Sequence, residues 1–146
     1  MTLSILGIDI KNKNWQLRKT ILTYISMSLI AIVVDNIYAI FGHGVRSAAM
    51  TWMFIYPLIC GALIYFLIER LIPGVGKTTG YRLFYNVYNS GIATLTVGGF
   101  LKGILEIAGT SSTYIVLFNV IGWLFILVGL ILLASCMLRY IRQTQF

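Results

Sequence analysis

Four long hydrophobic stretches, separated by polar or glycine-containing segments, make up most of the chain. They cover residues 20–41, 48–68, 83–105 and 114–138. The hydrocarbon core of a bilayer is about 30 Å thick, and about 20 helical residues are needed to cross it. Only Asp35 and Lys102 carry a formal charge within the four stretches. The pattern predicts an all-α fold, in which a polytopic integral membrane protein forms a four-helix transmembrane bundle.

The composition narrows the class of protein further. Charged residues make up 10% of the chain, whereas they make up about 25% of a typical soluble domain. A soluble protein of 146 residues could not bury this much apolar surface in one core. We therefore expect a single transmembrane domain over residues 20–138, preceded by a basic segment (1–19) and followed by a short tail (139–146).

The basic residues are sorted by side. The N-terminal segment, the connection between the second and third stretches and the C-terminal tail contain Lys11, Lys13, Arg18, Lys19, Arg70, Lys77, Arg82, Arg139 and Arg142. The opposite side has Arg46 and Lys102. The positive-inside rule therefore predicts a multi-pass protein with both termini in the cytoplasm, and the plasma (inner) membrane of a bacterium fits this pattern. Nucleic-acid binding is not indicated, because the basic residues flank helix ends instead of forming a stripe with interleaved aromatics.

Asp35 is the most unusual polar residue within the first stretch. It lies 16 residues beyond Lys19, which is about 24 Å along a helix and so in the outer third of the bilayer. A carboxylate at this depth costs a few kcal/mol unless it has a partner, water or a proton. Asn36 adjoins it, and the first outer turn contains His43 and Arg46.

The outer end of the third stretch adds a second charged pair. Lys102 and Glu106 are four residues apart and therefore share one face of a helix. We expect these groups to converge with Asp35 and His43 in an outward-facing pocket that binds or relays a cation or proton. The alternative is that Asp35 pairs with Arg46 or Lys102 and locks the hairpin.

The cytoplasmic half of the third stretch carries a second polar group. Asn86, Asn89 and Ser90 lie on one helical face at three- and four-residue spacing. They are expected to line a water-filled path or hold a polar headgroup. The alternative is that they form hydrogen bonds between helices, typically worth about 1 kcal/mol each.

Small residues predict where helices pack closely. Gly98, Gly99 and Gly103 form small-xxx-small spacings that let another helix approach. In the second stretch, Pro57 is followed by Gly61, which predicts a kink near the middle of the membrane.

Catalysis is the least supported class of function. Cys60 and Cys136 fall within hydrophobic stretches, where cysteines are usually small packing residues. With a single histidine and no close ligand spacing, neither a metal site nor a cofactor is expected. No acid–base pair or activated nucleophile is recognisable, so the interpretation leans away from an enzyme.

The leading hypothesis is a small transport or ligand-binding membrane protein. We expect a homo-oligomer or a larger membrane complex, because four helices leave little interior for a pathway. The pocket would take a small ion, a small molecule or a lipid headgroup from the surrounding bilayer. The alternative is a non-catalytic accessory or assembly subunit of a larger complex, held through its glycine-rich helix faces.

Overall fold

The computed structural model describes residues 2–72, 75–78 and 80–144, and this part of the chain is helical and contains no strand. The helices are α1 (Thr2–Phe41), α2 (Ala48–Trp52), η1 (Tyr56–Leu63), α3 (Ile64–Leu71), η2 (Val75–Lys77), α4 (Tyr81–Ile107) and α5 (Ile115–Thr144). Four segments are long and apolar enough to cross a membrane: Arg18–Phe41, Ala48–Leu71, Tyr81–Ile107 and Ile115–Arg142. The structure therefore confirms the all-α fold and the four hydrophobic helices predicted from the sequence.

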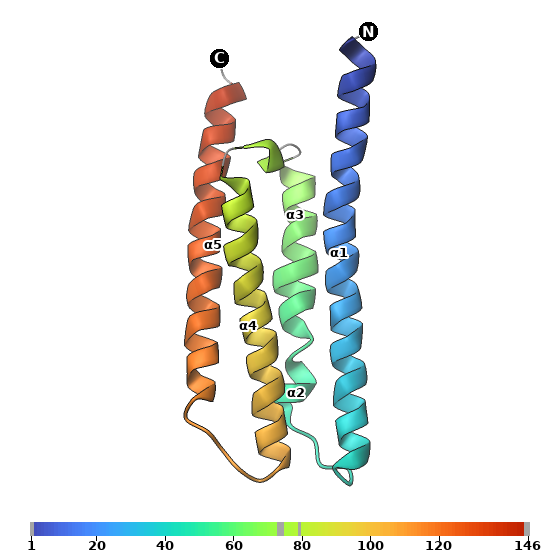
Figure 1. Cartoon of the computed structure of the whole chain (residues 1–146), viewed down its shortest axis with the longest axis vertical. Coiled ribbons are helices and arrows are strands. Elements are labelled where there is room, and N and C mark those ends of the chain that lie inside the picture. Colours follow the sequence, from blue (N-terminus) through green and yellow to red (C-terminus); the bar gives the residue numbers. More distant parts are fainter. Residues whose placement is uncertain (1, 73–74, 79, 145–146) are drawn as a thin grey trace.

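The chain runs up and down, so that both termini lie at one end of the molecule (Figure 1). We call this the terminal end, and the opposite end, with the turns at 42–47 and 108–114, the hairpin end. The second span (48–71) packs against α1 on one side and α4 on the other, and α4 packs along α5. The spatial order is therefore α1, second span, α4, α5, and α1 has a close backbone neighbour on one side only.

Helix α1 is longer than the first hydrophobic stretch. It begins at Thr2 and runs for 40 residues, or about 60 Å at 1.5 Å per residue. The segment 1–19, expected to precede the membrane domain, is from Thr2 onward a continuation of the same helix. The side chains of Lys11, Lys13 and Lys77 lie outside the described part of the structure.

The second span is interrupted where the sequence predicts a kink. Helix α2 ends at Trp52, and from Tyr56 to Leu63 the chain forms a π-helix that contains Pro57. Proline lacks an N–H, and π-helical turns are one way in which a membrane helix accommodates such an interruption. The hydroxyl of Tyr88 donates a hydrogen bond to the carbonyl of Cys60 at 2.8 Å, which gives this irregular segment a partner from α4.

The glycines predicted to mediate packing face neighbouring helices of the same chain. A Cβ at Gly98 would lie 2.7 Å from Cβ of Phe118 on α5, and one at Gly99 would lie 3.1 Å from Cβ of Met53. Gly103 lies against Met50, and the ring of Tyr24 fills the space beside Gly61. These close approaches are intramolecular, so the same surfaces are not open to a partner protein.

Candidate functional site

The buried carboxylate of Asp35 lies near the hairpin end and has two partners. Only 5% of the residue is exposed. Its Oδ2 is 3.6 Å from Nη1 of Arg46, and its Oδ1 accepts a hydrogen bond from the hydroxyl of Thr51 at 3.1 Å. Arg46 also donates to Oδ1 of Asn36 at 3.3 Å. Asp35 thus ties α1 to the first turn and to α2.

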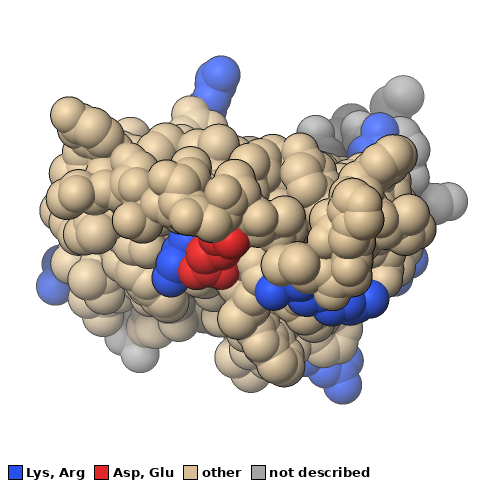
Figure 2. All heavy atoms as spheres, turned by 90° about the horizontal axis from the view of Figure 1, so that it is seen from below, with Lys and Arg blue, Asp and Glu red and all other residues tan. Residues whose placement is uncertain are grey.

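A second charged group ties the first turn to α4. Ser47, which caps the N-terminus of α2, donates a short hydrogen bond to Oε2 of Glu106. The other oxygen of Glu106 is 3.8 Å from Nζ of Lys102, one helical turn away. Seen from the hairpin end, a compact acidic patch is flanked by basic side chains (Figure 2). Each acid in this cluster therefore has a cationic partner.

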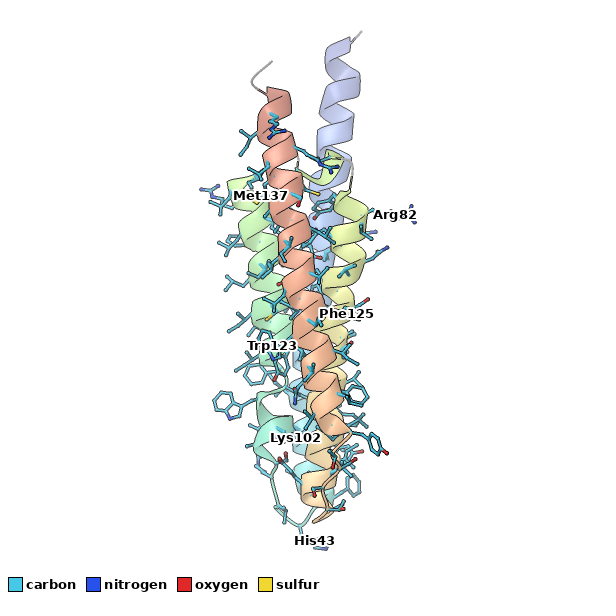
Figure 3. The ribbon with its side chains drawn as sticks, turned by 90° about the vertical axis from the view of Figure 1, so that its left-hand side faces the viewer. His43, Arg82, Lys102, Trp123, Phe125 and Met137 are labelled. Atoms are coloured by element: carbon cyan, nitrogen blue, oxygen red, sulfur yellow. The ribbon has the colours of Figure 1, made fainter. Side chains whose placement is uncertain are left out.

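His43 lies apart from this cluster. It occupies the tip of the first turn, in the left-handed region with φ of 54°, and its side chain is exposed. Figure 3 shows it at the extreme hairpin end, beyond Lys102. Within the described residues, no hydrogen bond or ion pair links His43 to Asp35. The geometry matches the alternative in which Asp35 pairs with Arg46 and locks the hairpin.

A separate space lies between α1 and α4. It is a groove of about 690 Å³ whose floor is formed by Met53 and Pro57 of the second span. Its walls are Lys19, Thr20, Thr23, Tyr24, Met27, Ile30, Ala31 and Val34 of α1, and Tyr85, Asn89, Ile92, Ala93, Thr96, Val97 and Phe100 of α4. The wall residues recur every three or four positions, so each helix contributes one continuous face. We call this space the α1–α4 groove.

The groove changes in chemistry along its length. At the terminal end it is lined by Lys19, Thr20 and Thr23, whereas towards the hairpin end its walls reach Val34 and Phe100. From Lys19 to Val34 is 15 residues, or about 22 Å along α1. The groove is therefore comparable in length to most of a bilayer's hydrocarbon core. Most of its polar groups lie near the terminal end, and the exception is Thr96, whose hydroxyl donates to the carbonyl of Ile92.

Asn89 is the one carboxamide among the residues of α4 that line this groove. Its Oδ1 accepts hydrogen bonds from the hydroxyls of Tyr24 at 2.6 Å and Tyr65 at 2.7 Å. These bonds bridge α1, the second span and α4. Two predictions were made for this residue, a polar lining and an interhelical hydrogen bond, and its geometry has both features.

The predicted polar lining of three residues is split by the geometry of the helix. Asn86 and Ser90 are exposed on a different face of α4, where the hydroxyl of Ser90 donates to the carbonyl of Asn86. Successive residues are about 100° apart around an α-helix, so Asn89 and Ser90 cannot point the same way. Of the three residues, Asn89 is the one that lines the groove.

An aromatic cluster behind Asn89 was missed by the sequence analysis. The fully buried ring of Tyr65 stacks on Tyr24, with centroids 5.8 Å apart, and contacts Phe84, Tyr85 and Tyr88. Tyr88 is itself buried. The signal was present in the spacing of Tyr81, Phe84, Tyr85 and Tyr88, which places them on one face of α4.

In the described part of the chain, no three His, Cys, Asp or Glu residues lie close enough together to hold a metal ion. The two cysteines there, Cys60 and Cys136, are not joined by a disulfide.

Comparison of the chain with protein-family models, with curated proteins and with solved structures finds no match. Function is therefore inferred from the geometry of this molecule alone.

Proposed function

We propose that this protein lies in a membrane with its terminal end in the cytoplasm and binds an amphipathic, lipid-like molecule in the α1–α4 groove. The observation that carries the proposal is the groove itself, which is apolar along most of its length and polar and basic near one end. An amphipathic molecule has the same division. Its apolar chain would lie along Ile30 and Ile92, and its headgroup near Lys19.

Charge at the terminal end supports an anionic headgroup. The exposed basic side chains described there are those of Arg18, Lys19, Arg70, Arg82, Arg139 and Arg142. Glu69 is the acidic residue described near them. Basic clusters next to a membrane attract anionic lipids, and they also favour the cytoplasmic side. The same residues thus support both the proposed orientation and the proposed ligand.

A pathway for a small ion is less well supported. An ion crossing a bilayer needs water or polar ligands, yet the walls of the groove at mid-length are mostly apolar, with Met27, Ile30, Ile92 and Val97. The hydroxyl of Thr96, which also lies there, donates to its own helix. Asp35, the expected ion site, already has Arg46 and Thr51 as partners. Lipid-like ligands suit these walls better, because their chains need no hydrogen bonds.

The test is to fill the groove. Ala93→Trp places a large side chain in its wall, whereas Ala134→Trp makes the same change at an exposed position of α5 that does not line it. Each delipidated protein would be titrated with phosphatidylglycerol in detergent, and bound lipid counted by native mass spectrometry. We expect Ala93→Trp to lose the tightest-bound lipid and Ala134→Trp to retain it. Equal binding by the two variants would contradict the proposal.

An accessory subunit remains the second candidate, and one surface supports it. Asn86 and Ser90 are exposed on α4 within a hydrophobic span, and polar residues on such surfaces commonly contact another helix. The glycine-rich face of α4, which was expected to bind a partner, is not available for this role. Gly99 and Gly103 already contact α2 and the turn that follows it. Loss of a co-purifying membrane protein on Asn86→Leu, with lipid binding unchanged, would favour this role.

A further inference from the structure

The carboxamide of Asn89 is oriented by its two tyrosine partners. The hydroxyls of Tyr24 and Tyr65 are 2.6 and 2.7 Å from Oδ1, and no other acceptor within the described residues is bonded to either hydroxyl. A phenol in an apolar setting needs an acceptor for its proton, so both must donate to the oxygen. The nitrogen then carries two N–H donors for which the described residues supply no acceptor. Since Asn89 is half-buried and lines the groove, these donors are available to a ligand there.

The position of this donor along the groove is informative. Tyr24, which bonds to Asn89, lies five residues beyond Lys19 on α1, which is about 8 Å deeper in the membrane. Beyond Asn89, the hydroxyl of Thr96 donates to the carbonyl of Ile92 in its own helix. From the terminal end, the groove is therefore lined first by a cation and hydroxyls, then by amide donors, and then mainly by hydrocarbon.

An ester-linked glycerophospholipid has the complementary order of groups. Its anionic phosphate is followed by ester carbonyls, which accept hydrogen bonds and donate none, and then by acyl chains. We infer that the groove holds an acyl chain of an anionic, ester-linked phospholipid from the leaflet at the terminal end, and that Nδ2 of Asn89 donates to an ester carbonyl. This inference rests on the proposed function and names its ligand class.

The inference predicts a preference that depends on one functional group. A diether phospholipid has the same headgroup and chains but lacks the carbonyls, so it leaves the donors of Asn89 unpaired. One hydrogen bond in such a setting corresponds to about a five- to tenfold difference in affinity. A free fatty acid also lacks a second acceptor below its headgroup, and we expect it to bind more weakly than the diester.

The experiment compares diester and diether phosphatidylglycerol of equal chain length, using the full-length protein and native mass spectrometry. Wild type should favour the diester about five- to tenfold. A triple variant removes the donor together with its two partners: Asn89→Leu, Tyr24→Phe and Tyr65→Phe. It leaves no tyrosine hydroxyl without an acceptor at this site, and it should bind both lipids equally. Asn86→Leu, on the exposed face of α4, should keep the preference.

The outcomes separate this inference from the proposed function. Equal affinity of the wild type for the two lipids, with binding still abolished by Ala93→Trp, would overturn the role of Asn89 and leave the groove as a lipid site. Binding that survives Ala93→Trp would overturn both. Because the wild-type comparison needs no variant, it decides the matter even where a substitution prevents folding.

Discussion

At the scale of single residues, Asp35 illustrates how a membrane protein accommodates a charge. The carboxylate is buried, whereas the side chain of its partner Arg46 is 56% exposed and so reaches from the turn towards water. Thr51 satisfies the second oxygen. Removing one partner of a buried pair is damaging mainly because it leaves the other charge without compensation. The half-exposed Arg46 reduces this effect without removing it.

We expect Arg46→Ala to lower the thermal unfolding midpoint in detergent, at a cost of about 1–2 kcal/mol. Lys102→Ala is the matched control, because it breaks a pair in which both side chains are substantially exposed and which should contribute about 0–1 kcal/mol. Adding Asp35→Asn to Arg46→Ala should recover part of the loss. Equal midpoints for the two single variants would show that Arg46 does not compensate the buried carboxylate.

At the scale of elements, helices α4 and α5 are joined by interlocking small and large residues. Gly98 receives Phe118, and Gly129 on α5 lies against Tyr88. In a bilayer the surrounding lipid is as apolar as the helices, so close van der Waals contact is a principal source of their association. Each glycine therefore determines how near the neighbouring helix can come.

Gly98→Ala and Gly99→Ala test this packing. Both replacements raise helix propensity by about the same amount, roughly 1 kcal/mol, so their difference reports contact alone. The new Cβ would lie 2.7 Å from Phe118 Cβ at Gly98 but 3.1 Å from Met53 Cβ at Gly99. We expect the first variant to have the lower unfolding midpoint, by the equivalent of about 1–3 kcal/mol. The opposite ranking would mean that α5 moves more easily than the second span.

At the scale of the whole molecule, hydrophobic length was sufficient to predict the four helices and their alternating direction. Periodicity could not predict which helices become neighbours, since large apolar side chains remain exposed along both α1 and α5. It therefore missed Tyr65, and it grouped Asn86 with Asn89 although their faces diverge. Of the expected outer site, the structure brings Asp35, Asn36 and Arg46 together, and Lys102 with Glu106, but leaves His43 outside. The direction of the His43 side chain depends on the backbone conformation of the turn. The pattern of hydrophobic residues does not predict that conformation.

Orientation in the membrane is a prediction for the whole molecule. The basic terminal end should lie in the cytoplasm. In cells, Ser111→Cys, exposed at the second hairpin turn, should react with a membrane-impermeant maleimide, in a background where Cys60 and Cys136 are alanine. A C-terminal green fluorescent protein should fluoresce, whereas a C-terminal alkaline phosphatase should be inactive. The reverse pattern would place the groove's basic end outside.

The π-helix in the second span changes how this protein can tolerate variation in length. A π-helical segment bonds residue i to i+5, so it takes up one residue more than an α-helix that presents the same faces before and after it. Deleting Leu58 or Ile59, both exposed, would let Tyr56–Leu63 return to α-helical bonding while Tyr65 kept its position beside Asn89. The same deletion in α4 would rotate all that follows by about 100°. Two hydrophobic spans of the same molecule thus differ sharply in the insertions and deletions that evolution could accept.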